Sequence, residues 1–138
     1  MLVMDKAALD AFLLEQFPQV AAEFRIDDLA EGALTLRLIV HERHLRPGGT
    51  VSGPAIFGLA DVAIYLTILA MIGPVALAVT TNATIDFMRK PQAGVDLICR
   101  TRLLKLGRVL AVADALICSQ GVEAPVARAS MTYAIPPK

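Results

Sequence analysis

One aspartate stands alone in the most apolar segment of the chain. Asp61 is the single charged residue between Pro54 and Ile72. A carboxylate in such a segment is costly to bury unless it is paired, neutralised or used in a reaction as a general base or nucleophile. The residues alone leave two interpretations open: Asp61 has a chemical role, or it faces solvent or pairs with an arginine.

The same segment begins at Gly53-Pro54, about two helical turns before the aspartate. If the segment is a helix, free backbone N–H groups and the positive end of the helix dipole lie at this point. Both features stabilise a developing oxyanion. Gly53 and Asp61 are therefore candidates for hydrolytic chemistry at a carbonyl group.

The apolar segment is long enough to be weighed as a membrane span. Against that interpretation stand the acidic residue, the polar Tyr65 and Thr67, the lack of flanking basic residues, and the strand-like segments that follow. We therefore predict a helix buried almost all round. Ser52 or Gly53 can cap it, and Pro54 suits its first position because the missing N–H would have no partner there.

The other predicted elements are short. A helical pattern covers residues 5–17, one half-buried strand covers residues 33–40, and four strands cover residues 78–88, 95–106, 109–118 and 124–135. Turn-forming residues separate the last four strands, which favours an antiparallel meander. With one or two strands before the long helix, the chain is expected to form one α+β domain over residues 1–138, its sheet curled around the helix.

The composition limits the classes of partner. Hydrophobic residues make up 56% of the chain and the mean hydropathy is +0.60, which favours an oligomer interface. Thirteen basic and thirteen acidic residues give no overall field that would attract nucleic acid or anionic lipid. The N-terminus lacks a secretory signal pattern, so a cytoplasmic location is expected. Cys99 and Cys118 lack CxxC spacing and are expected to be small buried hydrophobic residues.

A longer motif surrounds the aspartate. Residues 44–61 read His-Leu-Arg-Pro-Gly-Gly-Thr-Val-Ser-Gly-Pro-Ala-Ile-Phe-Gly-Leu-Ala-Asp. This stretch resembles the signature of PaaI-type hotdog thioesterases, H-x-N-x-x-G-x-x-H-G-G-x-x-x-x-L-x-D, and residues 80–91 with the later Gly107-Arg108 turn are similar to the rest of that family. The positions that agree are His44, Gly49, Gly53, Leu59 and Asp61.

The resemblance implies a hotdog fold and hydrolysis of acyl-CoA thioesters, with no metal and no cofactor beyond the CoA of the substrate. It also implies a homodimer, often paired into a homotetramer, whose active sites are shared between subunits. The residue matching Gly53 gives its N–H to the thioester carbonyl oxygen. The carboxylate matching Asp61 comes from the facing subunit as nucleophile or general base, and Thr80 matches a Ser/Thr that orients water in some members.

Binding of CoA phosphates would need basic side chains. The candidates are Arg46, Arg89, Lys90, Lys105 and Arg108. Each of them could also be an ordinary solvated charge.

Three residues depart from the family signature: Arg46 replaces Asn, Ser52 replaces His and Pro54 replaces Gly. Pro54 preserves a helix start, whereas Arg46 and Ser52 change side chains that would position the substrate. Ser52 is therefore a candidate site residue, and a non-catalytic acyl-CoA-binding homologue is the alternative function. A hotdog dehydratase is disfavoured because it would need the missing histidine for proton transfer.

Two further arrangements are disfavoured. A nucleophilic triad of Ser52, His44 and Asp61 lacks the G-x-S-x-G elbow of serine hydrolases. A metal site at His41, Glu42 and His44 lacks an additional ligand in the sequence nearby.

Overall fold

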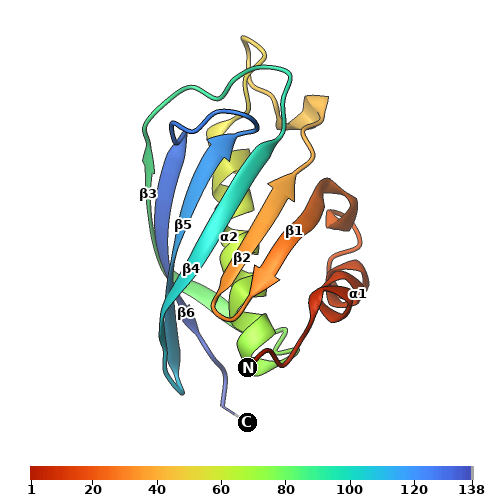
Figure 1. The fold of residues 1–138 in the computed structure, drawn as a ribbon, viewed down its shortest axis with the longest axis vertical. Coiled ribbons are helices and arrows are strands. Elements are labelled where there is room, and N and C mark those ends of the chain that lie inside the picture. The colour runs from red at the N-terminus through yellow and green to blue at the C-terminus, as the bar shows by residue number, and fades with distance from the viewer. Residues whose placement is uncertain (138) are drawn as a thin grey trace.

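An antiparallel sheet curls around one long helix (Figure 1). The structure is a computed structural model that describes residues 1–137. The elements in this range are α1 (Lys6–Gln16), β1 (Phe24–Ala30), β2 (Ala33–Leu38), α2 (Gly53–Ile72), β3 (Val79–Phe87), β4 (Leu97–Leu106), β5 (Leu110–Ser119) and β6 (Ala127–Ala134), with short 3-10 turns η1 (Ala21–Glu23) and η2 (Glu42–His44). The predicted α+β architecture is confirmed.

The long helix α2 forms the centre of the core. Its most apolar stretch of 18 residues has a mean hydropathy of 2.2, and 61% of that stretch is buried within the protein. Leu59, Ile64, Leu66 and Leu69 have no exposed surface. Full burial of one such side chain contributes about 1.5–3 kcal/mol. A helix that is apolar on every side is stable in water only when other elements cover it, and here the sheet and α1 do so.

Both ends of α2 are specified locally. The Ser52 hydroxyl oxygen accepts a hydrogen bond from the Ala55 N–H at 3.3 Å, so Ser52 is the N-cap, one of the two residues predicted to cap this helix. Pro54 is the second residue of the helix, one position later than predicted, and it still lies within the first turn. At the other end, Gly73 has a φ of 103°, a conformation that favours glycine and stops the helix.

The predicted meander is correct for β4, β5 and β6 and wrong for β3. The sheet order is β1-β2-β4-β5-β6-β3, so β4, β5 and β6 are successive neighbours. β3 pairs with β6 at the edge of the sheet instead of with β4. Residues 88–96 are too long a connection for a tight hairpin, and they cross from the edge of the sheet to its middle.

Two strands precede α2, although the sequence pattern clearly marked only one. β1 contains a bulge between Ile26 and Asp28, where Asp27 is the extra residue. A bulge shifts the side-chain alternation by one position, and two adjacent aspartates further obscure the pattern of a strand.

A buried histidine holds the loop before α2. His44 is 7% exposed, and its Nδ1 accepts a hydrogen bond from the His41 N–H at 2.9 Å. Its Nε2–H therefore donates to the Glu23 carboxylate, at 2.8 Å. The His44 carbonyl oxygen accepts from the Ser52 N–H at 2.8 Å. His44 thus connects η1 to the residue that caps α2.

The carboxylate at the base of this network is kept ionised. Burial by itself raises the pKa of Glu23, but hydrogen bonds from His44 and Arg43 outweigh that effect and lower the pKa below its ordinary value. The charged form of Glu23 therefore stabilises the folded loop.

We predict that Glu23→Gln lowers the melting temperature at neutral pH, because glutamine cannot supply the negative charge that both donors favour. The folded-state pKa lies below the ordinary value of 4.5, so the stabilisation is present above that pH and is lost as the pH falls through the folded pKa. In calorimetry, the difference in melting temperature between wild type and variant should become smaller below pH 4.5. A difference that stays constant or grows in acid would contradict the role of the charge.

Two buried hydroxyls connect the sheet to α2. Thr101 Oγ1 accepts a hydrogen bond from the Leu34 N–H at 3.0 Å and lies 2.6 Å from Thr67 Oγ1. Thr67 in turn donates to the Ala63 carbonyl oxygen at 2.7 Å. Thr101 therefore links β2, β4 and α2 in one chain of hydrogen bonds.

Thr101→Val should destabilise the protein by about 1–3 kcal/mol, because it leaves the buried Leu34 N–H without an acceptor. The control is Thr84→Val, the same change at an exposed position on β3, where an effect within about 0.5 kcal/mol is expected. Urea denaturation compares the two variants. Equal effects would show that the buried chain of hydroxyls is not required.

Candidate active site

The Asp61 carboxylate is held by two hydroxyl groups. Its Oδ1 accepts hydrogen bonds from Thr80 Oγ1 at 2.7 Å and from the Tyr133 hydroxyl at 2.5 Å. The Tyr133 hydroxyl also lies 3.1 Å from the Asp61 carbonyl oxygen. Asp61 therefore does not pair with an arginine, which was one of the interpretations left open.

A β-bulge brings Thr80 to this position. Thr80 lies opposite Tyr133, whereas Asn82 lies opposite Thr132, so Thr81 is the extra residue in β3. Without the bulge, Thr80 would share a face with Asn82 and would point away from α2. The resemblance alone suggested Thr80, and the bulge places it beside Asp61.

Tyr133 is the residue that sequence reasoning missed. Ala127, Ala129, Met131 and Tyr133 are the buried positions of β6 and face the helix. The signal that could have found it is this alternation, because a tyrosine on an inward face needs a partner for its hydroxyl. Burial, together with the hydrogen bond to Asp61, raises the pKa of Tyr133, which therefore stays protonated and donates.

A cavity of about 380 Å³ opens beside the Asp61 carboxylate. Its walls are mostly apolar, and α1, the segment after it, α2, β3 and β6 all contribute: Leu13, Phe17, Val20, Asp61, Val62, Tyr65, Ala76, Ala78, Val79, Thr80 and Tyr133. Phe17 and Tyr65 meet edge to face at 5.9 Å between ring centroids. The Tyr65 hydroxyl donates to the Ala76 carbonyl oxygen at 3.0 Å, so it is already satisfied. We name this space the aspartate cavity.

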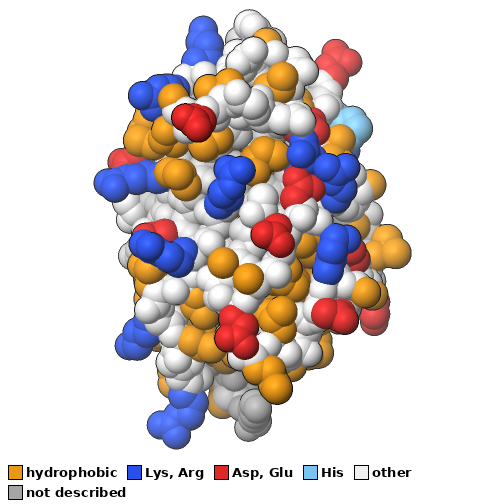
Figure 2. Space-filling view, in the orientation of Figure 1, with side chains coloured by type: hydrophobic (Ala, Val, Ile, Leu, Met, Phe, Trp, Pro, Cys, Tyr) orange, Lys and Arg blue, Asp and Glu red, His pale blue; other side chains and the backbone are white. Residues whose placement is uncertain are grey.

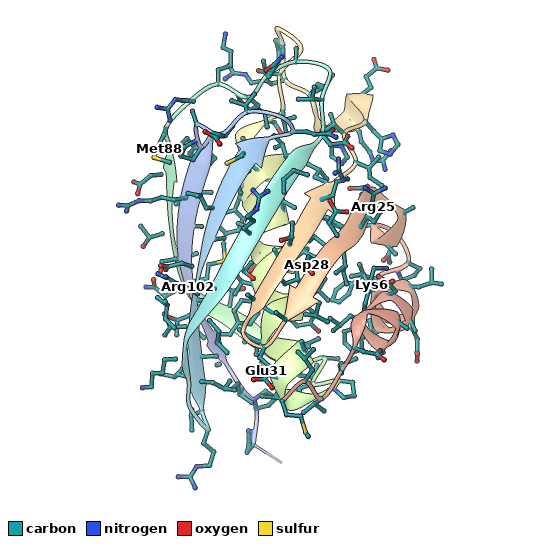
Figure 3. The ribbon with its side chains drawn as sticks, viewed as in Figure 1. Lys6, Arg25, Asp28, Glu31, Met88 and Arg102 are labelled. Carbon is teal, nitrogen blue, oxygen red and sulfur yellow. The ribbon has the colours of Figure 1, made fainter. Side chains whose placement is uncertain are left out.

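A second cavity, of about 450 Å³, lies at the start of α2. It is lined by Arg46, Thr50, Val51, Gly53, Ile56, Phe87, Met88, Arg89, Lys90 and Pro91. Three basic side chains and no acidic one are among these lining residues. Met88 lies just beyond the end of β3, at the same end of the sheet as the loop before α2 that carries Arg46 (Figure 3). We name this space the helix-start cavity.

One N–H group in the first turn of α2 has no acceptor within the helix. Pro54 has no N–H, Ala55 donates to the Ser52 side chain, and Ile56 donates to the Ser52 carbonyl oxygen at 3.1 Å. Gly53 is the first helical residue, so the helix supplies no acceptor for its N–H. An anion or a carbonyl oxygen in the helix-start cavity would meet this donor.

The five predicted phosphate-binding residues divide into two groups. Arg46, Arg89 and Lys90 line the helix-start cavity, and the Arg89 guanidinium also donates to the Pro125 carbonyl oxygen at 2.9 Å. Lys105 and Arg108 lie at the β4–β5 turn, at the opposite end of the sheet (Figure 1). The connection before β4 carries Arg89 and Lys90, and the next turn carries Lys105 and Arg108. Antiparallel strands place two successive connections at opposite ends of the sheet, so a single chain does not bring Lys105 and Arg108 to the cavity.

Three aromatic residues of α2 and β3 also separate. Tyr65 lines the aspartate cavity and Phe87 lines the helix-start cavity. Phe57 lines neither of these cavities, although it is half-buried on α2.

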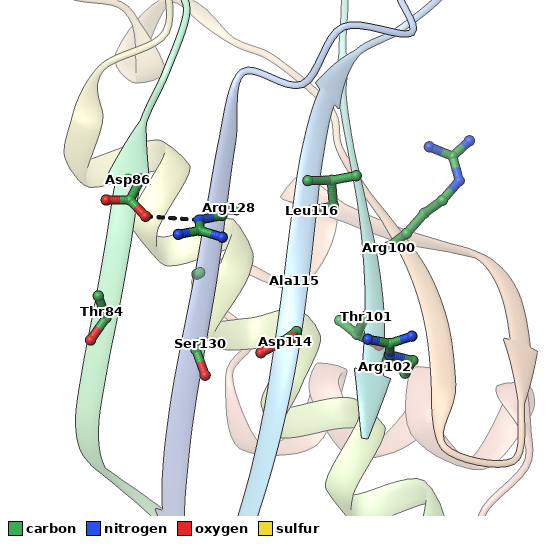
Figure 4. Close-up of a pocket in the computed structure, with 11 residues that line it drawn as sticks. Thr84, Asp86, Arg100, Thr101, Arg102, Asp114, Ala115, Leu116, Arg128 and Ser130 are labelled. Carbon is green, nitrogen blue, oxygen red and sulfur yellow. Dashed lines mark hydrogen bonds and ion pairs between the residues drawn. The ribbon is translucent and has the colours of Figure 1, made fainter. Parts of the chain in front are cut away.

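A third hollow, of about 500 Å³, lies on the face of the sheet that points away from α2 (Figure 4). Charged and hydroxyl side chains are among its lining residues, and an ion pair of 2.9 Å joins Asp86 on β3 to Arg128 on β6. Charges of both signs are interspersed over the face that is turned to the viewer in Figure 2. Neither Asp61 nor Gly53 lines this hollow.

The triad of Ser52, His44 and Asp61 does not form. Both ring nitrogens of His44 are engaged, by Glu23 and by the His41 N–H, so His44 is not available to activate Ser52. The Ser52 oxygen caps α2. Across residues 1–137, no group of three or more His, Cys, Asp or Glu side chains has the geometry to hold a metal ion.

Gly53 and Asp61 of one chain are too far apart to act on one carbonyl group. They are eight residues apart on the same helix, which corresponds to about 12 Å along its axis. A thioester carbonyl spans a far shorter distance. A site that uses both groups therefore needs the Gly53 of one chain and the Asp61 of another.

Comparison with known proteins gives the family. The model of the family described as "Thioesterase superfamily" matches residues 48–126. The crystal structure of a "putative thioesterase" from Silicibacter sp. TM1040 is 64% identical, covers 99% of this chain and 95% of that chain, and has a TM-score of 0.94. A protein of Pseudomonas aeruginosa named "Putative esterase" is 33% identical over 78% of each chain.

A mutant of the phenylacetic acid degradation protein PaaI from Thermus thermophilus is also similar. It is 28% identical, the match covers 86% of this chain and 99% of that one, and the TM-score is 0.74. The chain therefore belongs to the thioesterase superfamily and is a PaaI-like hotdog thioesterase.

Proposed function

We propose that this enzyme hydrolyses acyl-CoA thioesters with Asp61 as its catalytic carboxylate and the Gly53 N–H as the donor to the thioester oxygen. The supporting observation is the pair of cavities on α2. The aspartate cavity is mostly apolar and suits an acyl group, whereas the helix-start cavity is cationic and carries a free N–H. The reaction in this proposal uses no metal and no cofactor beyond the CoA of the substrate.

Coenzyme A is the proposed leaving group because its phosphates match the charge of the helix-start cavity. Arg46, Arg89 and Lys90 would hold these phosphates. The crystal structure of smu.793 from Streptococcus mutans, 25% identical and with a TM-score of 0.72, contains acetyl CoA. Arg46 replaces a neutral family residue, and in this proposal it adds to the positive charge of the cavity.

In this mechanism the thioester carbonyl oxygen accepts the Gly53 N–H, and the partner subunit's Asp61 faces the carbonyl carbon. As a general base, the carboxylate takes a proton from water while the water oxygen bonds to that carbon. The Gly53 N–H stabilises the resulting oxyanion. The carbon–sulfur bond then breaks, and the proton passes to the CoA thiolate. Direct attack by the carboxylate is the variant of this route in which water cleaves the resulting anhydride.

The surface around the site supports a homodimer. Pro54, Gly58 and Asp61 follow one another at helical spacing, and this strip of α2 is not fully covered by the sheet of its own chain. The edge strand β3 is unpaired on one side, and Val79 and Phe87 are 55% and 54% exposed. A second copy placed against β3 would cover both surfaces and complete each site. Pairing of two such dimers into a homotetramer is part of the same proposal.

Asp61→Asn should lower kcat by roughly 10²- to 10⁴-fold and leave the fold intact. The asparagine carbonyl can still accept from Thr80 and Tyr133, but it is neither basic nor nucleophilic. Thiol release from a panel of acyl-CoAs measures the effect, with Asp86→Asn on the opposite face of the sheet as the control.

Wild-type turnover in Asp61→Asn would contradict the proposed carboxylate. The alternative of a non-catalytic acyl-CoA-binding homologue has a different outcome. In that case the wild-type protein would bind CoA esters tightly and would release no thiol from any of them.

A mixing experiment tests the shared site. Asp61→Asn and Gly53→Pro each remove one half of it, and proline suits this position because Ser52 has an extended φ and ψ and the first helical turn accepts proline. When equal amounts of the two inactive variants are refolded together, half of the dimers should contain one subunit of each variant. Each mixed dimer then has one intact site and one site that lacks both groups. Thiol release should then recover to about one quarter of the wild-type rate.

Each variant alone should remain inactive and sediment as an oligomer. Failure of the mixture to regain activity, although the subunits have exchanged, would show that Gly53 and Asp61 do not act across an interface.

A further inference from the structure

We propose that Tyr133 is a positioning residue that leaves Oδ2 of Asp61 as the reacting oxygen. This inference rests on the proposed function, since it assigns a role to a group that acts through the Asp61 carboxylate. It concerns a side chain that the family signature around residues 44–61 does not include.

The first observation is the asymmetry of the hydrogen bonds to the carboxylate. Thr80 and Tyr133 both donate to Oδ1, at 2.7 and 2.5 Å. Within residues 1–137, no protein group donates to Oδ2. A carboxylate oxygen that accepts two hydrogen bonds has less charge available for bonding to a proton or a carbon, so the basic character is concentrated on Oδ2.

The second observation is that the tyrosine is itself rigidly held. Tyr133 is 3% exposed, and β6 lies between β5 and β3, so its backbone pairs on both sides, with Ala111 and Thr80. Its ring packs against Tyr65, with 5.9 Å between the ring centroids. A phenol fixed in this way holds the carboxylate plane as well as its charge, because the same hydroxyl contacts the Asp61 backbone carbonyl.

The third observation is the chemistry of the cavity. Tyr65 and Tyr133 are the titratable side chains that line the aspartate cavity together with Asp61, and no cation lines it. The side chains that donate to the Asp61 carboxylate are therefore hydroxyl groups and not cations. Because Tyr133 stays protonated, it continues to donate through the neutral pH range.

Tyr133→Phe tests this role, since it removes the hydroxyl and keeps the ring. We expect kcat to fall about ten- to a hundredfold while KM changes less than about threefold, because orientation and charge distribution act mainly in the transition state. A packing role would raise KM along with the fall in kcat, so the split between the two constants is the informative readout.

The matched control is Thr132→Val. Thr132 precedes Tyr133 on β6 and points to the other face of the sheet, so it loses a hydroxyl without touching the cavity. This control should keep the wild-type kcat and KM. If Tyr133→Phe melts at a lower temperature, both variants are assayed at a temperature at which circular dichroism shows them folded.

An active wild-type enzyme that depends on Asp61 and is unchanged in kcat by Tyr133→Phe would overturn the inference. A rise in KM as large as the fall in kcat would overturn it as well, since that result indicates a packing role. Failure of the proposed function looks different: Asp61→Asn would then retain wild-type turnover whatever the tyrosine does.

Discussion

The burial of α2 is the constraint on which the rest of the protein depends. A helix that is apolar on every side has no solvent face, so other elements must cover it nearly completely. The sheet curls around it and α1 closes part of the remaining side. One strip near Pro54, Gly58 and Asp61 stays partly exposed. The only acidic group of the helix lies in that strip, so the requirement for cover and the proposed chemistry coincide.

Within this setting, no cation lines the cavity beside the Asp61 carboxylate. Thr80 and Tyr133 both donate hydrogen bonds to one of its oxygens. Hydroxyl donors stabilise the charge and leave the second oxygen available, whereas an arginine in a bidentate pair would occupy both. The arrangement requires β3 and β6 to be neighbours, and the bulge at Thr81 turns Thr80 toward the helix.

The departures from the family signature are accommodated at the start of the same helix. Ser52 stands where the family has histidine, and its hydroxyl caps α2. Pro54 preserves the first turn and leaves Gly53 as the free donor. Arg46 joins Arg89 and Lys90 around the helix-start cavity, which raises its positive charge. Ser52 thus serves the helix cap, and Arg46 serves the positive charge of the cavity.

The sequence by itself determined the elements whose signals are local. The long helix and five of the six strands follow from periodicity and turn residues, and one isolated charge at a fixed distance from a helix start made Asp61 and Gly53 the candidate site residues. Only the tertiary structure decided which strands are neighbours, because the length of residues 88–96 permits several pairings. That decision placed β3 beside β6, and with it Thr80 and Tyr133 on Asp61. It also separated Lys105 and Arg108 from the basic group at the helix start. Contacts between residues far apart in the chain depend on register and bulges, which a local pattern does not encode.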